Sequence, residues 1–121
     1  AKSVKSTLKA SLETIDGVQF LAQEVDLDQG SIKDLAFELG SEFDNLFLMF
    51  GSSYNGKAML SCYISKNLVK DRDLNAGTIV RELGRFIQGG GGGQPFFATA
   101  GGKNPAGIPE ALQKAKSYIE A

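Results

Sequence analysis

The chain has 121 residues, 42% of them hydrophobic and 22% charged, and these values are those of one ordinary folded domain and not of a disordered chain. Its 13 basic and 14 acidic side chains leave a formal net charge of −1, which excludes attraction to nucleic acid by a strong overall positive field, so an anionic partner must bind a local patch. The sequence has no histidine and one cysteine, which excludes a Ser-His relay, a histidine-ligated zinc, a thiolate metal site and an internal disulfide.

The first predicted element is a helix that ends before Gly17. Four apolar residues recur at helical spacing in it: Val4, Leu8, Leu12 and Ile15. Such a helix either packs on the core of its own domain or is the end of a longer helical stalk or linker. We therefore divide the chain into residues 1–16, the helical end, and residues 17–121, a globular domain.

A strand over residues 18–25 and a helix from Ser31 are predicted next. In the strand, Val18, Phe20 and Ala22 face one side, and Leu21 and Val25 face the other. Ser31 with Asp34 approximates a capping box, and the apolar stripe that follows is Ile32, Leu35, Ala36, Leu39 and Phe43. Gly40 lies inside this stripe and lowers helix stability, so we expect it to pack closely against a neighbour.

Two strands joined by a tight turn are predicted in the middle of the chain. Residues 46–50 are a continuous apolar run, which is typical of a strand that is covered on both faces. Asn55-Gly56 is a strong hairpin signal, and residues 57–64 alternate between an apolar and a wetter face. Cys62 lies on the apolar face, so we expect a buried, inert thiol.

A polar stretch over residues 65–73 leads to a helix over about 75–88, whose inner residues are Ile79, Val80, Leu83 and Ile87. The glycine run is followed by a short strand over about 95–100 and by a final helix that begins near Pro109. The order β-α-β-β-α-β with flanking N- and C-terminal helices predicts an α/β (α+β) fold with a four-stranded mixed sheet.

Catalytic and cofactor chemistry is not expected in this chain. The two carboxylates of Asp71-Arg72-Asp73 can touch Mg²⁺ in principle, but in a polar segment ahead of a helix they are better explained as solvated and capping charges. We expect no catalytic residue, no bound metal and no cofactor. Because no apolar run is long enough to cross a bilayer, we also expect a soluble cytoplasmic domain without a membrane partner.

The most unusual feature is the run of glycines at positions 89 to 93: Gly89, Gly90, Gly91, Gly92 and Gly93. Each glycine costs conformational entropy on folding and offers no side chain to the core. Such a run can take positive φ and turn its N–H groups into a concavity for an anion, or it can let a partner approach the main chain closely. The alternatives are a flexible linker and a tight connection between a helix and a strand.

Cations near the run bear on these alternatives. The run follows a helix, so it meets the negative end of the helix dipole, and a phosphate there needs compensating charge. Arg81 and Arg85 share a helix face at this spacing, and Lys103 follows the next strand; together they can supply that charge, or the arginines can form a solvated face paired with Glu82 or Asp73. Since Gln94 and Pro95 follow the glycines where a P-loop has Lys and Ser or Thr, nucleotide binding is not supported.

Four segments together resemble a known family: Leu74-Asn75-Ala76-Gly77, Val80-Arg81-Glu82-Leu83, the glycine run with Gln94-Pro95, and Ala98-Thr99-Ala100-Gly101-Gly102. They resemble the domain that accompanies DHH-type phosphoesterases, in the version found at the C-terminus of bacterial alanyl-tRNA synthetases. Phosphoesterase members have a histidine after fewer glycines, whereas this chain has Gln94. The departure favours the synthetase branch.

The resemblance implies an accessory domain that binds tRNA, with alanine-specific tRNA as the expected partner. It implies contact with the outer corner of the L-shaped tRNA, in support of aminoacylation and editing by upstream domains, and dimerisation in some members through the adjoining helical region. The implied RNA-binding residues are Gly89 to Gly93, Gln94, Arg81, Arg85 and Lys103. Phe96 and Phe97 either offer a stacking face or are buried. The alternatives are the substrate-binding domain of a DHH-type phosphoesterase and a protein-interaction module.

Overall fold

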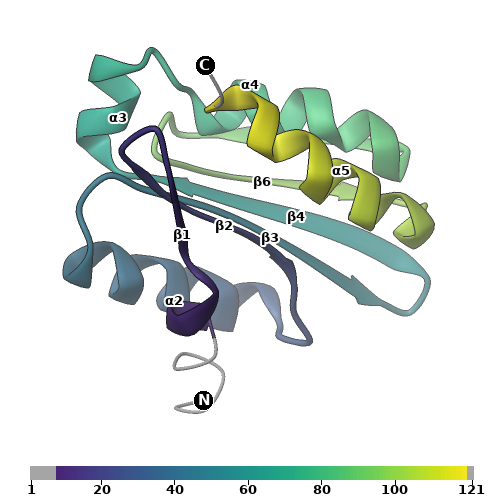
Figure 1. Cartoon of the computed structure of the whole chain (residues 1–121). Helices are drawn as coiled ribbons and strands as arrows, with labels where there is room; N and C mark the ends of the chain where they lie inside the picture. Colours follow the sequence, from purple (N-terminus) through teal and green to yellow (C-terminus); the bar gives the residue numbers. More distant parts are fainter. Residues whose placement is uncertain (1–7, 120–121) are drawn as a thin grey trace.

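The computed structural model describes residues 8–119, in which six strands form one sheet with helices on both faces (Figure 1). The strands are β1 (Glu13–Ile15), β2 (Val18–Glu24), β3 (Leu46–Tyr54), β4 (Lys57–Ile64), β5 (Gly89–Gly93) and β6 (Phe97–Gly102). Their order across the sheet is β1-β2-β3-β4-β6-β5, and β2 with β3 is parallel while the other pairs are antiparallel. The mixed sheet is confirmed, but the prediction of four strands is wrong, because β1 and β5 extend it at both edges.

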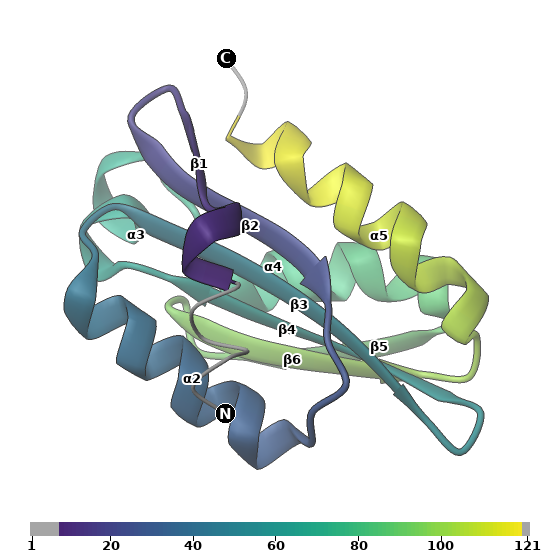
Figure 2. The same cartoon turned by 60° about the horizontal axis from the view of Figure 1, so that its bottom comes forward.

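Helices cover the two faces of the sheet unequally. They are α2 (Gln29–Glu42), α3 (Lys66–Asp71), α4 (Ala76–Leu83) and α5 (Ile108–Ala115), with short 3₁₀ turns η1 (Gly84–Ile87), η2 (Pro105–Gly107) and η3 (Lys116–Tyr118). The helices α4 and α5 lie together on one face, and α2 lies on the other (Figures 1 and 2). None of the helices over residues 8–119 is long and apolar enough to span a bilayer.

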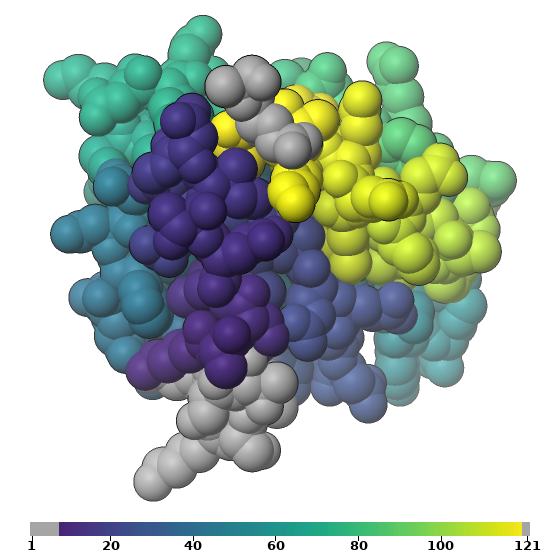
Figure 3. All heavy atoms as spheres, in the orientation of Figure 1, coloured from purple at the N-terminus to yellow at the C-terminus, as the bar shows by residue number. Residues whose placement is uncertain are grey.

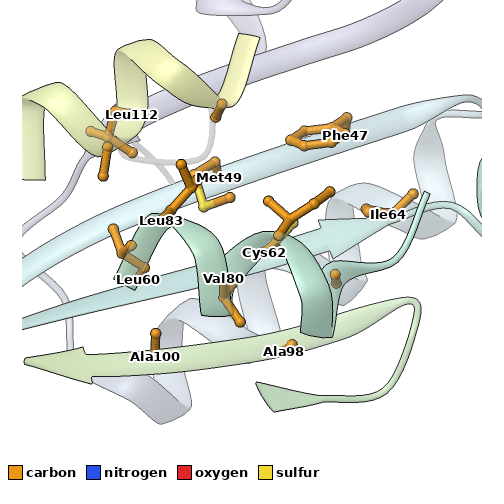
Figure 4. Packing of buried hydrophobic residues seen from close by; sticks show 14 of the residues in the cluster. Phe47, Met49, Leu60, Cys62, Ile64, Val80, Leu83, Ala98, Ala100 and Leu112 are labelled. Carbon is orange, nitrogen blue, oxygen red and sulfur yellow. The ribbon is translucent and has the colours of Figure 1, made fainter. Parts of the chain in front are cut away.

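Strand alternation produces one core on each side of the sheet. The larger core lies between the sheet and α4 and α5, where Val80 and Leu83 face Cys62 and Leu60 of β4 (Figure 4). The smaller core lies under α2 and includes Leu21 and the inner residues of that helix. The predicted faces of β2 are therefore confirmed, because Val18 and Phe20 enter the larger core while Leu21 enters the smaller one.

The prediction of a continuous first helix up to Ile15 is wrong. Residues 8–11 are helical, but residues 13–15 form β1, which returns to β2 through Asp16 and Gly17 at φ +51° and +82°. Both turn residues take positive φ, as in the tight turns that suit the twist of a hairpin, and pairing with β2 outweighs the helical spacing. Figure 3 shows this segment beside the C-terminal helix, where Lys116 Nζ lies 3.8 Å from the Glu13 carboxylate.

Residues 1–7 lie outside the described part of the chain, and with them the predicted helical position Val4. Leu8 is 1% exposed and belongs to the smaller core, and Ile15 packs against the larger one. The division of the chain at residue 16 stays a prediction.

Three helix boundaries differ from those predicted. Helix α2 begins at Gln29, because the Asp28 carboxylate accepts a hydrogen bond of 2.7 Å from the Ser31 N–H and so caps the helix earlier than Ser31 would. The polar stretch after β4 contains α3. The helix predicted up to residue 88 ends at Leu83 and continues as the 3₁₀ turn η1, after which Gln88 takes a left-handed φ of +56°.

The close contact expected at Gly40 is confirmed. A Cβ at this position of α2 would overlap the phenol ring of Tyr63 on β4. The glycine therefore lets the helix approach the sheet at the point where a bulky aromatic side chain stands. The gain in packing offsets the low helix propensity of glycine.

The N-cap of α4 generates a testable prediction. Asn75 Oδ1 accepts a hydrogen bond of 3.1 Å from the Thr78 N–H, which is one of the backbone donors left unpaired at a helix start. We expect Asn75→Ala to lower the free energy of unfolding by about 1 kcal/mol in urea denaturation. Asn75→Asp keeps an acceptor at the same place, so it should retain most of the stability; an equal loss in both variants would contradict the capping role.

Candidate functional site

The glycine run is an edge strand of the sheet. All five residues of β5 pair antiparallel with β6, from Gly89 opposite Gly102 to Gly93 opposite Ala98 (Figure 2). Within the run only Gly93 has a positive φ, of +153°, so the backbone is extended and does not curl around an anion. The prediction of an anion-binding concavity is therefore wrong, as is that of a flexible linker, because pairing with β6 extends the segment.

Every second glycine of the run is required by packing. A Cβ at Gly91 would lie 2.5 Å from Ala100 Cα, and one at Gly93 would lie 2.8 Å from the Phe97 carbonyl oxygen. A Cβ at Gly89 would overlap the backbone of Gly101. These are contacts with the main chain of β6, which cannot move aside as a flexible side chain can.

Two further glycines, Gly77 of α4 and Gly84 at the start of η1, let these two elements lie close to the strand. A Cβ at Gly77 would lie 3.2 Å from the Gly93 carbonyl oxygen, and one at Gly84 would lie 3.1 Å from the Gly89 carbonyl oxygen. The two positions are two helical turns apart and meet the two ends of β5. This contact is not among those predicted from the sequence, although a pair of glycines seven residues apart in a helical pattern is a signal for it.

Packing does not explain three other glycines of β5 and β6, which we call the bare strip: Gly90, Gly92 and Gly101. No heavy atom lies within 4 Å of a Cβ placed on Gly90, and the nearest to one on Gly101 is the Ala58 carbonyl oxygen at 4.0 Å. Gly90 and Gly101 pair directly, and both are exposed. None of the three has a positive φ, so a side chain would meet neither steric overlap nor backbone strain.

Two of the three predicted cations, Arg81 and Lys103, lie beside this edge. The Arg81 guanidinium lies 3.8 Å from the Cβ position at Gly92, and Lys103 follows Gly102, which pairs with Gly89. Arg85 belongs to η1, so the two arginines lie in different helical elements and not on one continuous helix face. All three side chains are exposed, and across residues 8–119 none of them forms an ion pair.

The acidic residues proposed as partners for these arginines are placed elsewhere. The Tyr118 hydroxyl donates a hydrogen bond of 2.7 Å to the Glu82 carboxylate, and burial together with this bond raises the pKa of Tyr118. Arg72 reaches the Asp16 carboxylate at 3.0 Å and so fastens the β1–β2 turn. Among residues 8–119 no ion pair joins Arg81 or Arg85 to Glu82 or Asp73, so the alternative of a solvated face holds without that pairing.

The turn between β5 and β6 carries the remaining predicted residues. The Gln94 N–H donates to the Phe97 carbonyl oxygen at 2.9 Å and closes the turn, while the Gln94 side chain is exposed. Phe96 and Phe97 are both half-buried. Their rings lie near that of Phe37 on α2, with centroids 6.4 Å and 5.5 Å away.

A groove of about 560 Å³ lies on the α2 face, where the bare strip meets the start of that helix. It is lined by Asp26, Asp28, Ser52, Lys57, Met59 and Gly101, among other residues. Hydrogen bonds from Ser31 lower the pKa of Asp28, so this carboxylate is ionised at neutral pH. Two carboxylates against one lysine do not suit a substrate that carries phosphate.

Among the side chains of residues 8–119, no three or more of His, Cys, Asp and Glu are grouped so that they could hold a metal ion. Cys62 is buried, as the alternation of β4 predicts, and burial raises the pKa of its thiol. The described residues therefore present a backbone edge without side chains and exposed cations near it. Both features suit a surface that contacts an anionic partner.

Comparisons with known proteins identify relatives of the chain. Residues 17–121 match the family model of the DHHA1 domain. The chain is 68% identical over 120 residues to an alanine–tRNA ligase of Christiangramia forsetii and 44% identical over 119 residues to that of Flavobacterium psychrophilum. It covers 14% and 13% of the lengths of these two proteins, so it corresponds to a small part of each.

Solved structures that are similar to this chain include a domain of an alanyl-tRNA synthetase. The C-Ala domain from Aquifex aeolicus alanyl-tRNA synthetase superposes with a TM-score of 0.78 at 25% identity, covering 91% of this chain and 98% of that one. A DHH-domain member of the s1p family of ribosomal proteins superposes with a TM-score of 0.61 at 13% identity, covering 99% of this chain and 31% of that one. The second likeness concerns the fold alone.

The two classes of glycine predict opposite effects on stability. We expect Gly91→Ala to lower the free energy of unfolding by about 1–3 kcal/mol, because its Cβ would overlap β6. Gly90→Ala should leave stability within about 0.5 kcal/mol of the parent or raise it, since its Cβ enters open space. Urea denaturation of both variants measures this; equal destabilisation would contradict the division of the run.

The buried thiol predicts slow chemical labelling. Because burial raises the pKa of Cys62, the folded chain holds a neutral thiol at pH 8, and a thiol-specific reagent should label it only after addition of urea. The unfolded chain ionises above its ordinary pKa of about 8.5 while the folded chain does not, so stability should fall as pH rises beyond that value. Rapid labelling of the folded chain at pH 8 would contradict this burial.

Proposed function

The chain belongs to the DHHA1 domain family, and from this premise we propose that it is the C-terminal tRNA-binding domain of an alanine–tRNA ligase. The observation that carries the proposal is the bare strip of Gly90, Gly92 and Gly101, which lacks side chains although the fold has room for them. The similarity of the chain to alanine–tRNA ligases indicates that the partner is tRNA. On this proposal the domain binds tRNA, and catalysis belongs to other parts of the protein.

The geometry of β5 supports contact with an RNA backbone. An edge strand leaves alternate N–H and C=O groups unpaired on its outer side, and N–H groups can donate to phosphate oxygens. Without side chains, a ribose or phosphate can approach this main chain closely. Arg81, Arg85 and Lys103 then supply positive charge along the same edge, which the whole molecule with its net charge of −1 cannot do.

We further propose that the tRNA surface is the outer corner of the L, where the domain would hold the tRNA for aminoacylation and editing by upstream domains in the cytoplasm. Proteins recognise folded RNA largely by its shape, its 2′-hydroxyl groups and its phosphates, and a flat side-chain-free edge suits that mode. Dimerisation through an adjoining helical region stays a prediction.

A substrate-binding domain of a DHH-type phosphoesterase is less well supported. The sequence has no histidine to place after the glycines, and the groove beside the bare strip is lined by Asp26 and Asp28. A protein-interaction module would use the same exposed edge by adding a strand to it. The salt dependence of binding separates this alternative from RNA contact.

We expect the chain to bind an alanine-specific tRNA transcript weakly, with affinity that falls steeply with added salt. Gly90→Val should weaken binding by about fivefold or more without loss of stability, because its side chain stands between the strand and the RNA. Arg81→Gln should reduce the slope of log affinity against log salt by about 1. Fluorescence titration at several salt concentrations measures both effects.

Lys114→Gln is the matched control, since this exposed lysine lies on α5, outside the proposed surface. It should change neither affinity nor slope by as much as Arg81→Gln. Absence of tRNA binding at low salt, or unchanged binding by Gly90→Val, would contradict the proposed use of the glycine edge.

A further inference from the structure

Five residues from distant parts of the sequence form a cluster at one end of the bare strip, in which Phe96 and Phe97 are half-buried and the other three are exposed. We call it the aromatic–lysine patch: Lys33, Phe37, Lys66, Phe96 and Phe97. We propose that this patch stacks on an exposed nucleobase or terminal base pair of a folded RNA and holds the neighbouring phosphates. The inference rests on the proposed function, since it takes RNA as the partner, and it adds a second, chemically different contact.

Phe37 is the centre of the patch. It is 37% exposed, and among the described residues Phe37 and Tyr54 are the exposed large hydrophobic side chains. Its ring lies 5.5 Å from that of Phe97 at an interplanar angle of 46° and 5.3 Å from that of Tyr63 at 80°. The contact with Tyr63 is edge-to-face and that with Phe97 is tilted, and together they hold the Phe37 ring at the surface without a polar partner.

Two lysines flank the rings. Lys33 Nζ lies 5.9 Å from the Phe97 centroid, and Lys66 Nζ lies 5.3 Å from the Phe96 centroid, both within the range of cation–π attraction. Lys33 precedes Phe37 by one turn of α2, while Lys66 begins α3, so the two charges come from different elements. Across residues 8–119 neither lysine forms an ion pair.

This combination fits RNA better than a protein surface. Every apolar member of the patch is aromatic, and aromatic faces stack on any nucleobase with little regard to its identity. The lysines at its border match the phosphates that accompany a base. The two lysines, and not the rings alone, favour RNA, because aromatic residues are also common at protein interfaces whereas lysine is depleted there.

The patch also continues the bare strip. Gln94 and Pro95 join the end of β5 to Phe96, and Phe97 lies on the same face of β6 as Gly101, since the two are four residues apart in one strand. Arg81, beside Gly92, lies toward this end of the strand. An RNA backbone that follows β5 from Lys103 would therefore reach the aromatic rings.

The test replaces the ring and retains an apolar side chain. We expect Phe37→Leu to weaken binding of the alanine-specific tRNA transcript by about 5- to 100-fold, as loss of one stacked base does. Because no charge changes, the slope of log affinity against log salt should stay that of the parent. The double variant Lys33→Gln with Lys66→Gln should instead lower the slope by about 2.

Two further variants separate stacking from folding. Phe37→Trp keeps an aromatic face and should bind as tightly as the parent. Equal binding by this variant would indicate that the loss of affinity in Phe37→Leu comes from the missing ring and not from unfolding. The second variant is the control Lys114→Gln on α5, outside both the patch and the bare strip, and it should bind as the parent does. Thermal unfolding of each variant is measured alongside binding.

The outcomes distinguish the two proposals. If the parent chain does not bind the transcript, both the proposed function and the patch are overturned. If it binds and Phe37→Leu binds equally well, the patch alone is overturned. If Phe37→Leu instead abolishes self-association in sedimentation and leaves tRNA binding unchanged, the patch is a contact between copies of the chain, and the proposal is overturned.

Discussion

The close approach of α4 to the glycine strand is the constraint on which the rest of this surface depends. Gly77 and Gly84 let the helix meet the two ends of β5, and Gly89, Gly91 and Gly93 let that strand lie against β6 without side chains between them. A Cβ at any of the three strand positions would overlap the β6 backbone. The edge strand β5 can therefore form because it consists only of glycine, although glycine is a poor strand former.

This constraint divides a run of identical residues into two kinds. The packing of β5 explains Gly89, Gly91 and Gly93, but it leaves Gly90 and Gly92 unexplained. A residue that costs entropy and is required by neither packing nor φ indicates a constraint from outside the domain. The bare strip and the exposed cations beside it are consistent with an RNA partner, and the aromatic–lysine patch extends the surface beyond the strand.

The domain also shows how a nearly neutral chain can present a basic surface. Three of its 14 acidic side chains are engaged within the domain: Asp28 caps α2, Glu82 accepts a hydrogen bond from Tyr118, and Asp16 pairs with Arg72. Within residues 8–119, Arg81, Arg85 and Lys103 form no ion pair. The chain spans about one seventh of the length of its Christiangramia forsetii relative, and on the proposed function such a local patch would add to contacts made by other domains, so its own affinity can be weak.

The sequence by itself determined the elements that local patterns specify. Alternation predicts β2 and β4 with their faces, a continuous apolar run predicts β3, and Asn55-Gly56 predicts the turn that joins β3 to β4. The apolar stripe of α2 and the burial of Cys62 follow from periodicity in the same way. The motif segments also determined the family. Only the tertiary structure decided that residues 13–15 and the glycines are strands, because strand pairing is non-local and glycine carries no periodic signal. It likewise decided which glycines are structural and that Phe37 meets Phe96, since contacts between distant segments depend on how the helices pack on the sheet.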